Sequence, residues 1–284
     1  MQRTNKPMKL NQIYYKSSTK MSELDDESVH LIITSPPYFN IKDYSQNGTN
    51  KEQDLGNIAD YNAFIQGLMM VFKECFRVLK PNGKLCVNVP LMPILKKNLN
   101  THYNRHIFDL QSDIQHNILH QTDFFLYDLY IWNRIYQSTN LMFGSYPYPR
   151  NFYSQNTSEF ITIYVKDGKT KDFIAKEIKE QSKLTQKEWL EFTKQIWNIP
   201  PVNASDEAWG KHHAIMPKEI PYRLIKLFSF VGDIVLDCFA GSGTTLKVAR
   251  ELNRHYIGYE LYEHYKQVIE YKTQQEPSLF ENLG

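Results

Sequence analysis

The sequence predicts an α/β fold built around a sheet whose strands end in polar turns. Residues 31–34 are three large aliphatics and a threonine, and Pro36-Pro37 ends this buried strand because proline cannot donate to a sheet ladder. A second buried strand, residues 234–237, runs into a turn of small residues and then a helical stretch at 246–252. Residues 255–260 follow as a further strand that ends in a glutamate. Strands and helices alternating in this way are typical of a nucleotide-binding α/β sheet.

The first part of the chain predicts two more strands, a polar loop and a helix. Residues 12–15 form a short apolar and aromatic strand. A polar loop over residues 39–58 has a length often found in lids and substrate-contacting segments. Apolar residues recur at helical spacing over residues 59–79, and Pro81-Asn82-Gly83 predicts a turn before the alternating strand 85–89.

The middle of the chain predicts two strands separated by polar segments. Residues 91–123 are polar, and histidine pairs spaced by four occur there, at His102, His106, His116 and His120. Such pairs can bind a metal on a helix, but the spacing is frequent by chance, so we predict no metal site. An aromatic strand at 124–132 leads to a loop at 139–151 rich in Tyr, Pro and Asn, and a strand at 159–165 follows. From residue 166 to 197 the composition shifts to a lysine-rich helix with interspersed acids.

The small-residue turn after residue 237 predicts a cofactor site. Gly241 and Gly243 let the backbone approach a ligand closely, and the helix that follows offers free amide hydrogens at its N-terminus. Glu260 ends the next strand, where a nucleotide-binding sheet holds ribose hydroxyls. The sequence therefore predicts a cofactor that contains adenosine.

The turn after residue 34 offers groups that suit a flat base carrying an amino group. Ser35 provides a hydroxyl, the carbonyls of Ser35 and Pro36 are acceptors, and Tyr38 provides an aromatic face. Taken alone, these residues are more typical of a plain strand that ends in a Pro-Pro loop. The cofactor turn elsewhere in the chain shifts the balance toward a substrate site.

Together the two turns resemble motifs of the amino-methylating DNA methyltransferases, which use S-adenosylmethionine (SAM). Residues 34–38 match the catalytic motif and residues 237–245 match the cofactor motif. The resemblance implies a Rossmann-like SAM-dependent methyltransferase fold acting on double-stranded DNA, with Ser35, Pro36, Pro37 and Tyr38 as catalytic residues. It implies cofactor contacts from Asp237, Phe239, Ala240, Gly241, Ser242, Gly243, Thr244, Glu260 and Pro217. The catalytic motif comes first, by about 200 residues, an order that resembles the circularly permuted beta group of the family.

The resemblance also suggests a division of the chain. Residues 1–165 correspond to the catalytic half of the methyltransferase domain and residues 201–284 to its SAM-binding half, and the short insertion at 166–200 is a candidate for target recognition. Residues 211–217 resemble the segment that holds the methionine end of SAM, so Lys211 and His213 are candidate pocket residues, although a structural histidine is as good an explanation. The family's first strand often ends in an acid that seats adenine, whereas residues 16–18 here are Lys-Ser-Ser. Glu159 resembles the family's strand-opening acid.

Two further segments are candidates for DNA contact. Lys42 and Tyr44 follow the catalytic turn, in a loop that is equally explained as a merely mobile connection. Arg134, Tyr146 and Arg150 belong to or precede the aromatic loop, where exposed aromatics and arginines suit stacking and phosphate contact. The same loop could also be a packed connection, and the family resemblance favours DNA binding.

The motif chemistry favours transfer to an exocyclic amine. None of the three cysteines lies in a Pro-Cys turn or near the substrate motif, so methylation of a ring carbon, which needs a cysteine nucleophile, is not expected. In the expected mechanism the Ser35 hydroxyl and the Pro36 carbonyl accept the amino hydrogens, and Tyr38 stacks on a base flipped out of the duplex. The Ser-Pro-Pro-Tyr spelling resembles the cytosine-N4 enzymes more than most adenine-N6 enzymes.

Three alternatives to cytosine N4 remain open from the sequence. One is methylation of adenine N6 by the same site. Another is methylation of RNA or of a protein side-chain amide, against which the motif order argues. The third is a catalytically silent DNA- or SAM-binding protein, against which the intact motif residues argue.

Composition predicts an ordinary globular protein. The 284 residues carry a net charge of +2, and five lysines and arginines precede Glu23, which suits either phosphate contact or a solvated terminus. No apolar run reaches eighteen residues and no signal-like segment opens the chain, so we expect no membrane span and a cytoplasmic protein. Three cysteines without metal-like spacing predict buried free thiols. The sequence leaves open a cognate restriction endonuclease and a homodimer.

Overall fold

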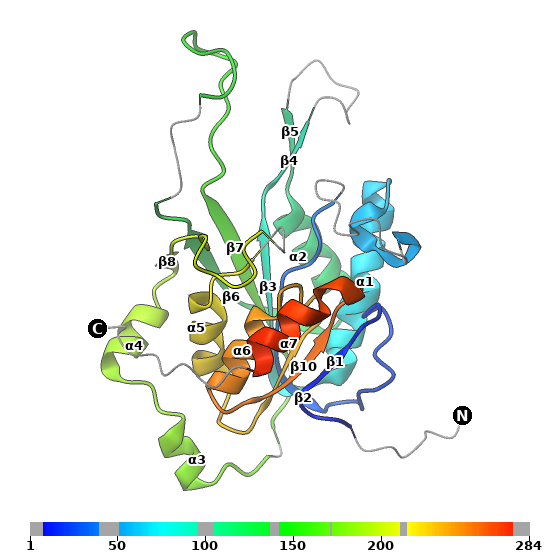
Figure 1. Ribbon diagram of the computed structural model, residues 1–284, viewed down its shortest axis with the longest axis vertical. Helices are drawn as coiled ribbons and strands as arrows, with labels where there is room; N and C mark the ends of the chain where they lie inside the picture. Colours follow the sequence, from blue (N-terminus) through cyan, green and yellow to red (C-terminus); the bar gives the residue numbers. More distant parts are fainter. Residues whose placement is uncertain are drawn as a thin grey trace.

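A computed structural model describes residues 8–39, 51–95, 105–136, 142–170, 172–210 and 215–274. Within these residues one sheet of eight strands runs through the molecule in the order β1-β10-β9-β2-β3-β7-β6-β8 (Figure 1). The strands are β1 (Gln12–Tyr14), β2 (Val29–Thr34), β3 (Leu79–Pro90), β6 (Phe124–Asn133), β7 (Ser158–Lys166), β8 (Ile196–Asn198), β9 (Ile234–Asp237) and β10 (His255–Tyr259). The sheet confirms the predicted α/β class.

The centre of the sheet brings the two motif strands together. Strands β1, β10, β9, β2 and β3 are all parallel, and β7 then runs antiparallel to both β3 and β6. Leu31 and Ile32 of β2 pair with Val235 and Leu236 of β9. The turns that follow β2 and β9 therefore lie at the same edge of the sheet.

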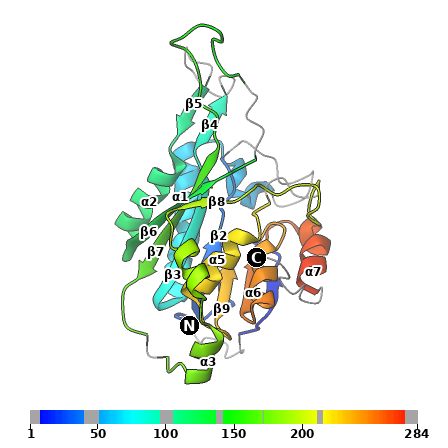
Figure 2. The ribbon, with the colours of Figure 1, turned by 90° about the vertical axis from the view of Figure 1, so that its left-hand side faces the viewer.

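Both faces of the sheet are covered by helices (Figure 2). Helices α1 (Tyr61–Val78) and α2 (Leu110–Gln121) pack on one face, and α5 (Glu219–Phe228), α6 (Thr244–Glu251) and α7 (Lys266–Gln274) pack on the other. Ile32 belongs to the core under α1 and α2, whereas Leu31 and Ile33 belong to the core under α5 and α6. A strand buried on both faces needs apolar residues at every position, which explains the uninterrupted run in β2.

The predicted helix at 59–79 is confirmed as α1, whose first turn is capped by Asp60 through a hydrogen bond from the Ala63 amide (2.8 Å). The turn predicted at residues 81–83 was expected to separate this helix from the next strand, but residues 81–83 lie within β3. The strand begins at once at Leu79 and contains a bulge there, because Val29 pairs with Leu79 while Leu31 pairs with Lys84. Asn82 adopts a φ of 64° inside this bulge.

The structure departs further from the prediction in the polar segment 91–123 and in the lysine-rich segment 166–197. Residues 91–123 contain the strands β4 (Met92–Leu95) and β5 (Arg105–Phe108), which pair as a hairpin, in addition to α2. The lysine-rich stretch forms two short helices, α3 (Lys176–Gln181) and α4 (Gln186–Phe192), whereas its composition predicts one continuous helix. Thr185 caps α4 in a capping box with Glu188, which explains why the helix restarts there.

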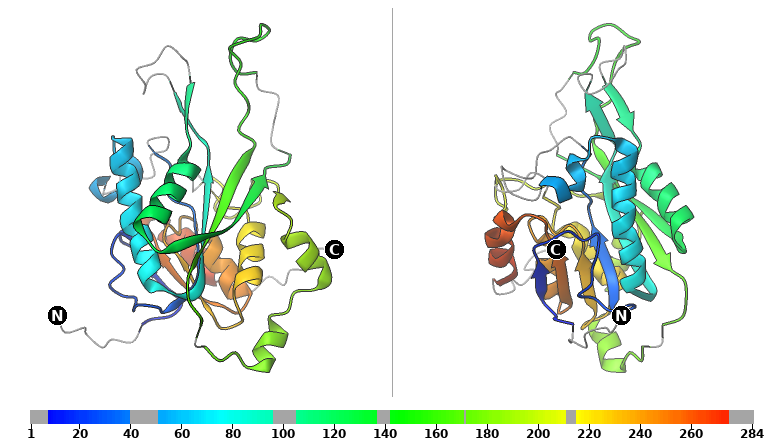
Figure 3. Two further views of the ribbon diagram at one scale, coloured as in Figure 1. Left: turned by 180° about the vertical axis from the view of Figure 1, so that it is seen from behind. Right: turned by 90° about the vertical axis from the view of Figure 1, so that its right-hand side faces the viewer.

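Two arms project from one end of the molecule, as all the ribbon views show (Figures 1, 2 and 3). One is the β4–β5 hairpin, and the other, here called the aromatic arm, consists of residues 142–153 between β6 and β7. Its two sides meet in a bridge between Gly144 and Phe152. Helix α3 lies at the opposite end of the molecule (Figure 3).

Two further expectations concern whole-chain properties. All three cysteines, Cys75, Cys86 and Cys238, are buried and free, as predicted. Among the described residues, no helix has both the length and the apolar character needed to span a membrane.

Candidate active site

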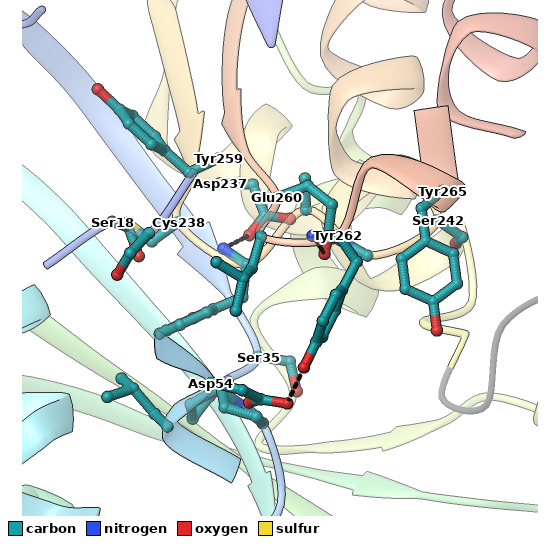
Figure 4. Close-up of a pocket in the computed structure, with 18 of the residues that line it drawn as sticks. Ser18, Ser35, Asp54, Asp237, Cys238, Ser242, Tyr259, Glu260, Tyr262 and Tyr265 are labelled. Carbon is teal, nitrogen blue, oxygen red and sulfur yellow. Dashed lines mark hydrogen bonds between the residues drawn. The ribbon is translucent and has the colours of Figure 1, made fainter. Parts of the chain in front are cut away.

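A cleft opens at the carboxyl ends of β2, β9 and β10 (Figure 4). The catalytic turn lines one side with Ser35, Pro36, Pro37 and Tyr38, and the cofactor turn lines the other with residues 237–242 and Thr244. The two motifs predicted from separate stretches of sequence thus share one cavity.

A buried hydrogen bond fixes the two motifs to each other. The Thr34 hydroxyl at the end of β2 donates to Asp237 Oδ1 at the end of β9 (2.8 Å), across 203 residues of sequence. The same Asp237 oxygen accepts from the Phe239 amide (3.1 Å), which starts the cofactor turn. Burial raises the pKa of Asp237 to about 6. Asp237 is therefore the residue that ties the catalytic strand to the cofactor turn.

Glu260 holds the other side of the cofactor turn. Its Oε2 accepts from the Gly241 amide (2.8 Å) and its Oε1 accepts from the Tyr262 amide (2.9 Å). Gly241 adopts a left-handed φ of 52°, which glycine reaches with little strain. Burial raises the pKa of Glu260 to about 7. Each carboxylate oxygen has a second lone pair, so Glu260 can still accept hydrogen bonds from a ligand in the cleft.

Gly243, a predicted cofactor contact, has a packing role. It does not line the cleft, and a Cβ at this position would lie 2.9 Å from Ile269 Cγ2 of α7. Its φ of 79° also favours glycine. This residue allows α7 to pack against the start of α6.

We expect Gly243→Ala to destabilise the protein by roughly 2–4 kcal/mol, because it combines left-handed strain with a clash. Gly232→Ala is the matched control: its φ is 87° and nothing lies within 4 Å of its Cβ position. That variant should cost only about 1 kcal/mol, the strain alone. Urea unfolding of both variants measures the difference, and equal losses would contradict the packing role.

Asp54 closes the cleft from a segment whose role the sequence did not reveal. It caps the short 3-10 helix Leu55–Asn57 and is only 6% exposed, and it accepts a hydrogen bond from the Tyr262 hydroxyl (2.6 Å; Figure 4). Asp54, Asp237 and Glu260 thus place three buried carboxylates around the cleft. Lys16 is the one Lys or Arg among the described lining residues, and its Nζ binds Glu23 (2.6 Å). The cleft therefore favours a ligand with positive charge.

The residues after β1 complete the cavity. Lys16, Ser17 and Ser18 line the cleft on the β1 side. Ser18 is buried. This wall offers hydroxyl groups to a ligand in place of a carboxylate.

A second, more open pocket adjoins the cleft and shares Ser35, Tyr38 and Met216 with it. The Ser35 hydroxyl donates to the backbone carbonyl of Asn88 (2.9 Å). The hydroxyl hydrogen of Ser35 is therefore engaged in this hydrogen bond, and the oxygen's lone pairs can accept a hydrogen bond from a substrate donor. Ser35 acts in this arrangement as a neutral acceptor where the two cavities meet.

A buried polar chain supports the wall of the second pocket. The Asn88 side-chain amide donates to Glu159 Oε2 (2.7 Å), and Arg134 pairs with Glu159 Oε1 (3.3 Å). Arg134 also donates to the Asn156 carbonyl. Glu159 is 5% exposed, so this carboxylate depends on its partners for charge compensation.

The remaining predicted residues lie in several places. Arg134 belongs to the pocket wall, with 19% of its side chain exposed. Tyr146 and Arg150 are exposed on the aromatic arm. Pro217 is buried but does not line the cleft, whereas its neighbour Met216 lines both cavities. The predictions for Lys42, Tyr44, Lys211 and His213 fall outside the described residues.

The histidines of the middle segment have a local explanation where the structure describes them. His120 Nδ1 is hydrogen-bonded to the His116 carbonyl oxygen (2.7 Å), and the two rings pack together on α2. Within the described ranges, no group of three His, Cys, Asp or Glu side chains is placed to hold a metal ion.

Comparison with known proteins agrees with this geometry. Residues 29–271 match the family model described as DNA methylase of the N6/N4 type. The chain is 33% identical to the Type II methyltransferase M.MjaI of Methanocaldococcus jannaschii, over 92% of this chain and 90% of that protein.

Solved structures show the same fold. A putative DNA modification methylase from Thermus thermophilus, complexed with S-adenosyl-L-methionine, superposes with a TM-score of 0.72 at 29% identity, over 94% of this chain and 96% of that one. The PvuII DNA methyltransferase, named as cytosine-N4-specific, has a TM-score of 0.67 at 18% identity, over 96% and 89% of the two chains. The chain therefore belongs to the N6/N4 DNA methylase family and is a SAM-dependent DNA methyltransferase.

Proposed function

We propose that this methyltransferase modifies the exocyclic N4 amine of cytosine in a base flipped out of double-stranded DNA. The observation that carries the proposal is the Ser35 hydroxyl, whose hydrogen is held by the Asn88 carbonyl (2.9 Å). A neutral acceptor with free lone pairs suits an amino group, and the small serine suits the smaller of the two amino bases. Adenine N6 is the alternative that the same chemistry could serve.

The catalytic turn supplies the groups that act on the base. Ser35 Oγ and the Pro36 carbonyl accept the two amino hydrogens, which frees the nitrogen lone pair from the ring and favours a tetrahedral nitrogen. Tyr38 stacks on the base and tolerates the positive charge that develops. Ser35 and Tyr38 line both the cleft and the second pocket, and this position supports the assignment.

The cleft residues fit SAM. When bound, SAM supplies the electrophilic methyl group and carries a sulfonium charge. The buried carboxylates of Asp54, Asp237 and Glu260 favour such a cation, and we assign the ribose hydroxyls to Glu260. The Gly241 turn lets the backbone approach the ligand.

We further propose that residues 1–165 and 201–284 are the catalytic and SAM-binding halves of one domain, in the circularly permuted order of the beta group. The pairing of β2 with β9 and the hydrogen bond between Thr34 and Asp237, 203 residues apart, support this order. The relative's designation as a Type II methyltransferase supports a cognate restriction endonuclease as a partner in the cell.

Nucleoside mass spectrometry tests the proposal directly. Unmethylated plasmid DNA is incubated with the protein and methyl-labelled SAM, and the label is expected in N4-methylcytosine. Label in N6-methyladenine would show that Ser35 does not choose the base. Label in RNA with none in DNA would show that the substrate is RNA and not DNA.

The pH dependence of SAM binding tests the role of Glu260. Hydroxyl donors favour the ionised carboxylate, so bound SAM lowers the pKa of Glu260 from about 7. Binding therefore releases a proton below pH 7, and affinity rises with pH up to about 7 and then levels off. We expect the Kd at pH 6 to exceed that at pH 8 by up to about tenfold.

Glu260→Gln is the matched control for this measurement. The variant should bind SAM more weakly at every pH and lose the additional dependence between pH 6 and 8, whereas titration of SAM itself affects both proteins equally. Calorimetric curves with the same slope for both proteins would remove Glu260 from the ribose site.

A further inference from the structure

The aromatic arm is an unusual feature for an exposed loop, because its tip is held in a defined turn. The Ser145 amide donates to the Asn151 carbonyl and the Tyr148 amide donates to the Ser145 carbonyl, both at 2.8 Å. The Ser145 hydroxyl also donates to the Tyr148 carbonyl (2.7 Å). The arm is thus a built projection that presents its side chains in a fixed arrangement.

The side chains presented by this tip are large aromatics. Tyr146, Tyr148 and Phe152 are 69%, 75% and 72% exposed. Exposed apolar groups gathered on one element indicate a contact surface. The arm projects from one end of the molecule (Figure 1). Asn156 and Glu159, which follow the arm in the sequence, line the second pocket, so this pocket lies near the base of the arm.

Charge along the sequence identifies the partner of this surface. No Asp or Glu occurs between Asp128 and Glu159. Arg150 in this stretch is exposed, whereas Arg134 is paired with Glu159. The segment between Glu74 and Asp109, which includes the β4–β5 hairpin, likewise has basic residues and no acid. Both projecting segments therefore suit a polyanion, and aromatic side chains beside arginine suit nucleic acid in particular.

The insertion at 166–200 also exposes aromatic side chains, with Phe173 92% and Trp189 59% exposed, but it is rich in acids. Lysines and acids alternate along it. Asp172 binds Lys80 (2.7 Å) near the start of β3, and Ser182 Oγ accepts from the Val231 amide (2.9 Å) before β9. Glu188 pairs with Lys226 of α5. These contacts hold α3 at the amino ends of the strands, opposite the catalytic edge (Figures 2 and 3).

We infer that the aromatic arm, and not the insertion, grips the DNA duplex beside the flipped base and discriminates target from non-target sites. The inference rests on the proposed action on double-stranded DNA. Tyr146, Tyr148 and Phe152 make the apolar contacts in a groove, and Arg150 binds a phosphate. The catalytic pocket itself binds only the flipped base and does not contact the flanking duplex.

A loop replacement tests the inference while keeping the rest of the arm. Because Gly144 and Phe152 face each other in a bridge, residues 145–151 can be replaced by the two-residue turn Asn-Gly. The variant should raise the KM for plasmid duplex and lower discrimination against single-base changes in the mapped target, each by about tenfold or more. The rate on heat-denatured plasmid strands and the Kd for SAM should stay within about threefold of the wild type, because neither depends on contact between the aromatic arm and a DNA duplex.

Two further variants guard against a folding artefact. Tyr146→Ser/Tyr148→Ser/Arg150→Gln leaves the backbone intact and should show the same selective loss. Lys176→Gln/Lys179→Gln neutralises two exposed lysines of α3 and should leave the duplex KM and the discrimination unchanged.

The outcomes separate this inference from the proposed function. A wild-type protein that labels no DNA would overturn both. Wild-type labelling of duplex DNA together with unchanged duplex KM and site choice in both arm variants would overturn only the role of the arm. The role would also be overturned if both variants only converted a dimer into monomers in sedimentation, which would mark the arm as a subunit contact.

Discussion

Tyr38→Ala is expected to lower the rate of methyl transfer by about 10–10²-fold, since stacking of an aromatic ring on a base is worth about 1–3 kcal/mol. Tyr38 lies between the cofactor cleft and the second pocket, where its ring can cover a flipped base. Without the ring, the base is less stable outside the duplex and is held less firmly against Ser35. Single-turnover rates on duplex DNA measure the loss.

Tyr38→Phe is the control for this prediction. It keeps the ring and removes only the hydroxyl, so its rate should stay close to that of the wild type. Calorimetry should give SAM affinities within a fewfold of wild type for both variants. If alanine lowered SAM affinity as much as it lowered the rate, the stacking role would be lost and Tyr38 would be a cofactor contact.

Arg134→Ala and Arg150→Ala should have different effects, although the sequence suggested phosphate contact for both. Arg134 compensates the buried carboxylate of Glu159. Removing it should cost about 3 kcal/mol and lower the melting temperature by about 5–10 °C. Arg150 is exposed on the aromatic arm, so its removal should leave the melting temperature unchanged and raise the KM for DNA.

The salt dependence of DNA binding separates the two arginines further. Arg150→Ala should reduce the slope of log K against log salt by about one, the loss of one phosphate contact. Arg134→Ala, compared at a temperature where it is folded, should keep the wild-type slope. A changed slope for Arg134→Ala with an unchanged melting temperature would show instead that Arg134 contacts a DNA phosphate.

The two motif turns could be predicted because their signals are local. Consecutive aliphatics followed by Pro36-Pro37 specify where a strand ends, and Gly241 marks a backbone that only glycine adopts easily. The resemblance of both motifs to one family of methyltransferases then implied that they belong to one site. The structure adds the contact that joins them, from Thr34 to Asp237.

Other site residues gave no local signal. Asp54 looks like an ordinary cap in a polar loop, and only the fold places it against Tyr262. Asn88 continues an alternating strand, and its neighbour across the sheet, Glu159, is 71 residues away. Long-range strand pairing decides such contacts, and residue type and spacing do not report it.

The pairing of β1 with β10 has a consequence for how the enzyme forms. The first strand of the chain lies at the sheet edge beside the last one, so the edge closes only when residues 255–259 have been synthesised. The walls of the SAM cleft after β1 and after β10 are completed in that same step. Contacts of such long sequence separation make folding slow. A nascent chain that lacks residues 255–265 therefore has an incomplete SAM cleft, even when its catalytic turn is already folded.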